Sequence, residues 1–88
     1  MTRIESRYTG RVQGVGFRAA VRAISASFAV SGWVRNEADG SVMVVAEGAE
    51  SEVDAFLESI QTRMARNIRS VDRVVGSAVG ESGFDIRR

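Results

Sequence analysis

Glycine and arginine are concentrated in residues 10–18, which read GRVQGVGFR and contain three glycines and two arginines. Glycine lets the backbone bend where a Cβ would clash, so one role of this segment is structural. The other is chemical, because bare backbone N–H groups at the start of a helix, beside a guanidinium, form a site for a doubly charged oxyanion such as phosphate. We call this segment the glycine loop.

The chain lacks three residue types on which many active sites depend. It contains no histidine, cysteine or lysine, and all 12 basic residues are arginine. These absences exclude thiolate nucleophiles, Schiff bases, imidazole acid–base catalysis and the common zinc sites. Any chemistry must therefore proceed without them.

Length and composition narrow the class of protein. At 88 residues the sequence predicts one domain over residues 1–88, and a net charge of +1 is too small to indicate nucleic-acid binding. No apolar run approaches the roughly 18 residues of a membrane span, and the N-terminus lacks the apolar core of a signal peptide. We therefore expect a cytoplasmic protein that binds neither nucleic acid nor membrane.

The segments around the glycine loop must position it. Alternating side chains predict a half-buried strand over 3–12, and helically spaced apolar residues predict a helix from Phe17 to near Val30. The remaining expected elements are a strand from Trp33, a turn at Asp39–Gly40, a strand over 41–48, a helix with Ser51 and Asp54 as a capping box, a strand around 70–79 and a short terminal strand in 82–88.

This order predicts an α+β, ferredoxin-like βαββαβ sandwich, with two helices on one face of an antiparallel sheet and a short C-terminal strand. We expect Phe17 and Trp33 to be core residues and Gly32 to end the connection after the first helix. Arg11 and Arg35 are expected to be solvated, because strand alternation directs them away from the buried face.

Two other folds place glycines or strands in a similar order. GVGFRA fits the dinucleotide-binding pattern G-x-G-x-x-A, but a hairpin directly after the second strand does not suit a doubly wound parallel sheet. An RNA-recognition fold shares the βαββαβ order, but it needs aromatic residues on the central strands, and the strand SVMVVAEG has none. The sequence therefore favours neither fold.

The glycine loop and the segment SGWVRNEADGSV at 31–42 together resemble the two signature segments of the acylphosphatase family. The resemblance extends along nearly the whole chain and includes the 18-residue separation of Arg18 from Asn36. It implies hydrolysis of the carboxyl–phosphate bond of acyl phosphates by a monomer without cofactor or metal. It also implies catalytic roles for Arg18 and Asn36, and substrate binding by Gln13, Gly14, Val15, Gly16, Phe17 and Arg18.

The chemistry of this reaction suits the residues that the chain has. The products are inorganic phosphate and a carboxylate, whose conjugate acid has a pKa of about 4, so the leaving group needs no general acid. Phosphoryl transfer depends mainly on positioning and charge stabilisation. Arg18 and loop N–H groups would hold the phosphoryl oxygens, and Asn36 would orient water, since an amide cannot act as a base. The alternative is a module of the same fold that binds phosphate or acyl phosphate without turnover.

Overall fold

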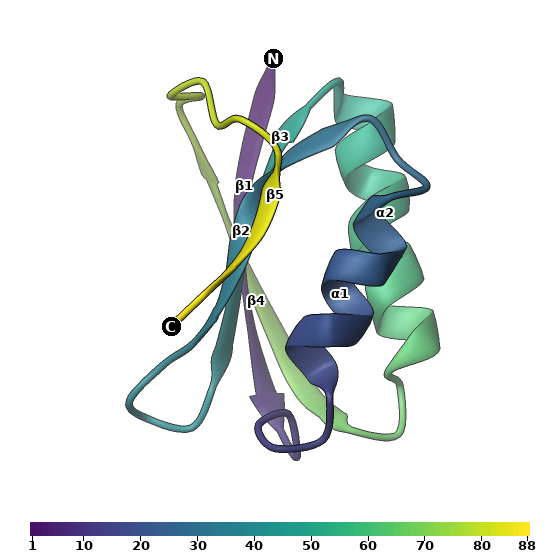
Figure 1. Cartoon of the computed structure of the whole chain (residues 1–88), viewed down its shortest axis with the longest axis vertical. Helices are drawn as coiled ribbons and strands as arrows, with labels where there is room; N and C mark the ends of the chain where they lie inside the picture. The colour runs from purple at the N-terminus through teal and green to yellow at the C-terminus, as the bar shows by residue number, and fades with distance from the viewer.

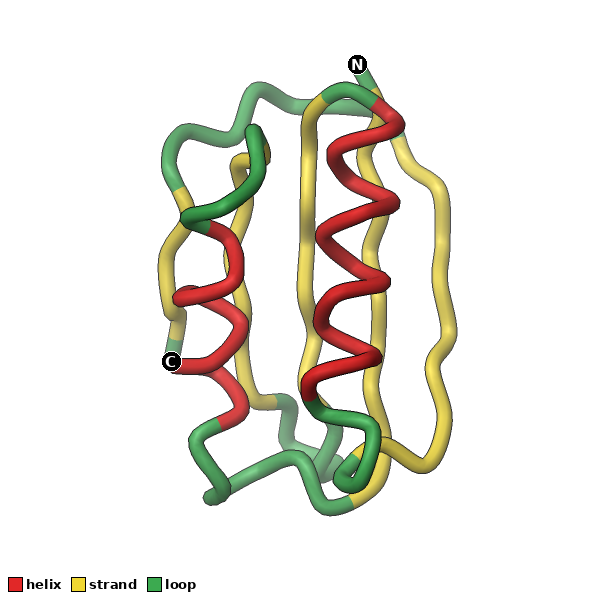
Figure 2. Tube along the Cα trace, turned by 90° about the vertical axis from the view of Figure 1, so that its right-hand side faces the viewer, coloured by secondary structure: helices red, strands yellow, loops and turns green.

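The computed structural model describes all 88 residues and confirms the predicted order of elements. In chain order these are β1 (Thr2–Gly10), α1 (Phe17–Ser25), β2 (Val30–Asn36), β3 (Val42–Gly48), α2 (Glu50–Arg63), β4 (Ile68–Gly76) and β5 (Phe84–Arg87). The strands form one sheet in the order β4-β1-β3-β2-β5. Both helices cover the same face of this sheet (Figures 1 and 2). The fold is the expected ferredoxin-like α+β sandwich.

The hydrophobic core lies between the sheet and the two helices. Alternation along β1 places Ile4 and Tyr8 on the helix side, where both are buried. Helix α1 buries Phe17, Val21 and Ile24 against them, as its apolar spacing predicted. Helix α2 contributes four more core residues, Val53, Phe56, Leu57 and Ile60. Neither helix is long and apolar enough to cross a membrane.

The end of α1 differs from the sequence-based expectation. The helix ends at Ser25 rather than near Val30, because residues 30–32 pair with β3 and begin β2. Gly32, expected to end the helix connection, lies within this strand with a φ of 152°. A Cβ at that position would lie 1.8 Å from the carbonyl oxygen of Val45. Glycine is therefore required there by the close approach of β2 to β3.

The start of α2 was also predicted wrongly. The N-cap residue is Ala49 and the helix begins at Glu50, so Ser51 and Asp54 form no capping box. Instead, Glu52 in the first turn accepts a hydrogen bond at 2.8 Å from the backbone N–H of Ala29. This contact connects the first turn of α2 to the segment before β2.

The sheet face away from the helices, which we call the open face, carries a buried carboxylate. Glu47 on β3 is only 2% exposed. Its carboxylate accepts hydrogen bonds from the Arg3 guanidinium at 2.8 Å and from backbone N–H groups of the loop between β4 and β5. Burial alone would raise the pKa of Glu47, but these donors outweigh it and lower the pKa to about 2.

Trp33 was expected in the core. It is buried, but it lies on the open face and outside the core between the sheet and the helices. Its indole N–H donates to Glu81 at 3.2 Å. The guanidinium groups of Arg35 and Arg87 stack on its ring, at 4.7 and 4.6 Å from the ring centroid. Charged side chains thus cover much of the Trp33 ring on this face.

The lowered pKa of Glu47 predicts a specific loss of stability in acid. A carboxyl group in the unfolded chain has a pKa of about 4.3, above the folded value, so the stabilisation is fully present above that pH and is lost as the pH falls toward about 2. Glu47→Gln should lower the free energy of unfolding at pH 7 and flatten its decline across this acid range. Urea unfolding followed by Trp33 fluorescence measures both quantities.

Glu58→Gln is the matched control, because Glu58 is exposed on α2 and forms no ion pair. It should retain the acid dependence of the wild type. If Glu47→Gln shows the same acid slope as the wild type, the buried carboxylate is not the source of that dependence.

Candidate active site

The glycine loop turns directly into the first turn of α1. Gly14 and Gly16 have φ values of 74° and 77°, a backbone conformation that side chains other than glycine rarely adopt. A Cβ at either position would meet nothing within 4 Å, so conformation rather than space requires glycine there. Gly16 is the N-cap of α1, no side chain caps the helix, and no acidic residue lies in its first turn. The N–H groups at this end are therefore available to an anionic ligand.

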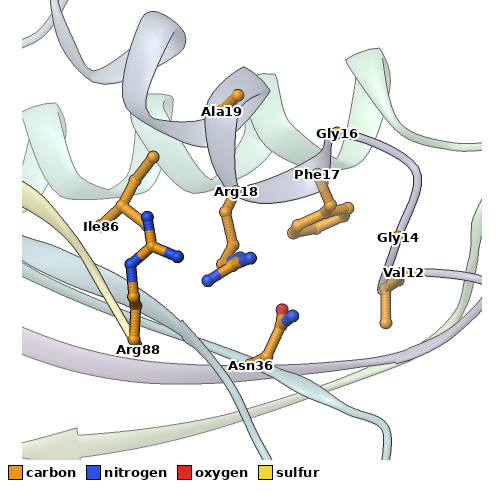
Figure 3. Close-up of a pocket in the computed structure, with 9 residues that line it drawn as sticks. All are labelled: Val12, Gly14, Gly16, Phe17, Arg18, Ala19, Asn36, Ile86 and Arg88. Atoms are coloured by element: carbon orange, nitrogen blue, oxygen red, sulfur yellow. The ribbon is translucent and has the colours of Figure 1, made fainter.

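A pocket of about 210 Å³ opens beside this helix end (Figure 3). It is formed by the glycine loop, the start of α1, the end of β2 and the C-terminal segment. The residues that line it are Val12, Gly14, Gly16, Phe17, Arg18, Ala19, Asn36, Ile86 and Arg88. Residues far apart in the sequence thus meet at one end of the α1 helix.

Arg18 presents an uncompensated positive charge to this pocket. It lies in the first turn of α1, where the helix dipole disfavours a cation. Its guanidinium forms no ion pair and donates one long hydrogen bond, 3.4 Å, to the backbone carbonyl of Arg87. Figure 3 shows its side chain directed toward Asn36. Most of its donors therefore remain free for a ligand.

Asn36 supplies the one hydrogen-bond acceptor among the side chains that line the pocket. Strand alternation places it on the same face of β2 as the buried Val34, so a polar side chain follows an apolar one on the core side. Its Oδ1 is buried and has no hydrogen-bond partner in the protein. Buried polar atoms nearly always have a partner, so this atom is available to a bound water or substrate.

Of the other residues expected to bind substrate, some line the pocket and some do not. Gly14, Gly16 and Phe17 line the pocket, and the Phe17 ring also packs in the core at 5.4 Å from that of Tyr8. The side chains of Gln13 and Val15 do not line it. Val15 is 40% exposed. Of these two residues, only the backbone belongs to the turn that precedes α1.

Gln13 connects the glycine loop to the turn after β2. Its side-chain amide donates to the carbonyl oxygens of Glu37 at 2.8 Å and Ser41 at 2.9 Å. Glu37 directly follows Asn36, so these bonds hold the loop and the end of β2 together. Gln13 therefore fixes the position of Asn36 relative to the glycine loop.

The carboxylates nearest in sequence to Asn36 form contacts outside the pocket. Arg35 donates to Glu37 at 2.7 Å, and this bond lowers the pKa of Glu37. Hydrogen bonds from the hydroxyl and backbone N–H of Ser41 lower the pKa of Asp39. Both groups are ionised at neutral pH and neither lines the pocket. The site can bind an anion and orient a water, but it offers no carboxylate as a general base.

Sequence reasoning missed four residues that line the pocket. Val12 and Ala19 directly adjoin the predicted segment 13–18, and the other two are Ile86 and Arg88. These last two lie at the C-terminal end of the chain, which reaches the pocket because β5 pairs in parallel with β2. The terminal segment was recognisable as a strand, but nothing local to it identifies the strand beside which it lies. Arg88 adds a second guanidinium to the pocket, again without an ion pair.

Comparisons with known proteins agree with this site. The family model described as Acylphosphatase matches residues 4–86. An acylphosphatase from Salinibacter ruber is 43% identical over 98% of this chain and 93% of its own length. One from Methanospirillum hungatei is 40% identical over 100% and 99%. The crystal structure of an acylphosphatase from Bacillus subtilis superposes over 100% of both chains with a TM-score of 0.90 and 30% identity.

The match covers the glycine loop, Asn36 and Ile86 within a single family model, and the structural likeness extends to the whole fold. The chain therefore belongs to the acylphosphatase family and is an enzyme that hydrolyses the carboxyl–phosphate bond of acyl phosphates, giving a carboxylate and inorganic phosphate.

Proposed function

We propose that this reaction takes place in the pocket at the start of α1, with Arg18 holding the phosphoryl group and Asn36 orienting the attacking water. One observation carries the proposal: the only side-chain acceptor lining the pocket, Asn36 Oδ1, is buried and unpaired, and an uncompensated guanidinium lies beside it. A phosphoryl group needs donors around its oxygens, whereas an oriented water needs an acceptor. The pocket contains both.

Backbone N–H groups of residues 14–18 and the Arg18 guanidinium donate to the phosphoryl oxygens in this mechanism. The positive-φ conformations of Gly14 and Gly16 expose this part of the backbone to the ligand. Arg18 adds paired donors and a permanent charge, which a loose phosphoryl-transfer transition state requires. Arg88 contributes a second positive charge to the same pocket.

Asn36 acts on the water rather than on a proton. A water molecule that donates a hydrogen bond to Asn36 Oδ1 is held on the pocket side of β2, in position to attack the phosphorus in line with the leaving carboxylate. Because carboxylates are good leaving groups, neither a general acid nor a metal is needed in this scheme. No three metal-ligating side chains gather anywhere in the structure.

Three further expectations stay predictions. They are that residues 1–88 form a single domain, that the enzyme acts as a monomer, and that it acts in the cytoplasm without binding nucleic acid.

The two proposed roles predict different defects in two variants. Asn36→Ala should lower kcat on benzoyl phosphate by about 10² to 10³, the usual cost of losing one preorganised transition-state contact, while the Kd for inorganic phosphate changes little. Arg18→Gln should impair both turnover and phosphate binding, with a much lower kcat and a much higher Kd for phosphate. Phosphate release and calorimetric titration with phosphate measure the two quantities.

Arg22→Gln is the matched control for Arg18, because Arg22 lies exposed on the same helix and outside the pocket. It should behave like the wild type. Loss of phosphate binding in a folded Asn36→Ala protein would contradict its role in orienting water. Absence of turnover in the folded wild type would indicate a binding module instead of an enzyme.

The conformation of the glycine loop can be tested with a pair of alanine substitutions. Gly14→Ala and Gly40→Ala place the same Cβ at positive φ in open space, so each should destabilise the fold by about 1–2 kcal/mol. Only Gly14 lies in the pocket, so only Gly14→Ala should also weaken phosphate binding. Equal phosphate affinity in the two variants would show that the backbone at Gly14 does not contact the ligand.

The pocket also predicts an unusual pH dependence. None of the side chains that line it carries a carboxyl, imidazole, thiol or phenol group. The kcat should therefore stay nearly constant between about pH 5.5 and 7.5, while KM follows the ionisation of the substrate phosphate, whose second pKa is near 6 as a rough guide. Rate profiles on two acyl phosphates with different pKa values test this. If kcat instead rises or falls near neutral pH, and does so at the same pH for both substrates, a titrating group of the enzyme acts as a base.

A further inference from the structure

The loop over residues 77–83, which joins β4 to β5, is held to the sheet by one buried carboxylate. Glu47 Oε2 accepts the N–H of Val79 at 2.8 Å, and Oε1 accepts the N–H groups of Gly80 and Glu81 at 3.0 and 2.9 Å. Arg3 donates to the same carboxylate at 2.8 Å. In Figure 1 this loop lies near the N-terminal end of β1, at the opposite end of the sheet from the glycine loop. Glu47 is thus remote from the pocket.

The anchored loop fixes the start of β5. Glu81 accepts hydrogen bonds from Trp33 Nε1 at 3.2 Å and from Arg3 at 3.0 Å, and it pairs with Arg87 at 3.8 Å. The backbone N–H of Gly32 donates to the Gly83 carbonyl at 2.8 Å, directly before the parallel register between β2 and β5 begins. The loop therefore sets where β5 enters the sheet.

Strand β5 in turn forms one wall of the pocket. It is a four-residue edge strand that pairs only with β2. Its first residue, Phe84, packs on Phe56 at the edge of the core, and the three residues after it are exposed. Its last residue, Arg87, accepts the hydrogen bond from Arg18, and the neighbouring Ile86 and Arg88 line the pocket. A displacement of β5 would move the acceptor of Arg18 and this wall together.

We propose that Glu47 is a positioning residue for the hydrolysis, acting from the far end of the sheet through the 77–83 loop and β5 to hold Arg18 and the C-terminal wall in place. The proposal rests on the role of Arg18 in binding the phosphoryl group. Glu47 touches neither substrate nor pocket. Its effect is on the fraction of molecules in which the pocket is complete, so it should act on binding more than on the chemical step.

Glu47→Gln in the full chain, compared with Glu58→Gln, tests the proposal with inorganic phosphate as the probe. Suppose that in the Glu47→Gln protein β5 keeps its native position in only about a tenth of the molecules. The phosphate Kd and the KM for benzoyl phosphate should then each rise about tenfold, while kcat changes less than about twofold. Glu58→Gln should change none of these. The measurements are made at a temperature where circular dichroism shows every variant folded.

A double-mutant cycle separates positioning from general destabilisation. In the Arg18→Gln background, titrated at high phosphate concentration, Glu47→Gln should raise the phosphate Kd by clearly less than tenfold, because the part of its effect that acts through Arg18 is gone. A tenfold effect of Glu47→Gln in both backgrounds would overturn the proposal, as would an unchanged phosphate Kd in folded Glu47→Gln. Unchanged phosphate binding in Arg18→Gln alone would instead overturn the role of Arg18, and this proposal with it.

A second variant covers the case in which Glu47→Gln does not fold. Glu81→Gln weakens the next contacts along the same path, to Trp33, Arg3 and Arg87, and Glu81 is less buried. It should raise KM in the same direction and show the same dependence on Arg18. Wild-type KM in folded Glu81→Gln would contradict the path from loop to pocket.

Discussion

The requirement that a buried carboxylate be fully hydrogen-bonded shapes one whole side of this molecule. An ionised group out of water is costly unless donors replace its hydration. Glu47 obtains three donors from consecutive backbone N–H groups and a fourth from Arg3. Those backbone donors belong to a loop about thirty residues further along the chain, so satisfying the charge requires that loop to lie across the sheet. The parallel strand β5 then follows at the edge of the sheet, beside β2.

The two faces of the sheet are therefore stabilised by different kinds of interaction. The helix side is an apolar core in which Tyr8, Phe17 and Phe56 are completely or almost completely buried. The open face is an ion-paired layer in which Trp33 lies between guanidinium groups. The active site lies where the apolar face ends: Val34 is the last core residue of β2, and Asn36 continues the same alternation into the pocket. The Oδ1 atom of Asn36 is buried because the side chain occupies a core-facing position, and it is unpaired because the core ends beside it.

Local patterns in the sequence were sufficient for the core and for part of the site. Alternation predicted β1 as a half-buried strand, helical spacing predicted the apolar face of α1, and the glycine loop with Asn36 identified two walls of the pocket. The rest depended on contacts between distant segments. Val30 continues a helical pattern but pairs with β3, and Glu47 occupies a polar strand position that only a later loop buries. The position of Arg88 follows from parallel pairing, which no residue in 82–88 specifies.

The composition of the pocket also bears on which phosphates the proposed mechanism would accept. Its side chains offer two guanidinium groups and one amide, but no group that can give a proton to a leaving oxygen. A carboxylate leaves without a proton because the pKa of its conjugate acid is about 4. An alkoxide does not, because the conjugate acid is as weak as water, with a pKa near 15.7 in bulk. Phosphate esters of alcohols would bind through the same phosphoryl contacts yet remain unhydrolysed. In this pocket, discrimination between acyl phosphates and phosphomonoesters would therefore lie in kcat rather than in binding, and it would follow from the absence of an acid rather than from any contact with the acyl group.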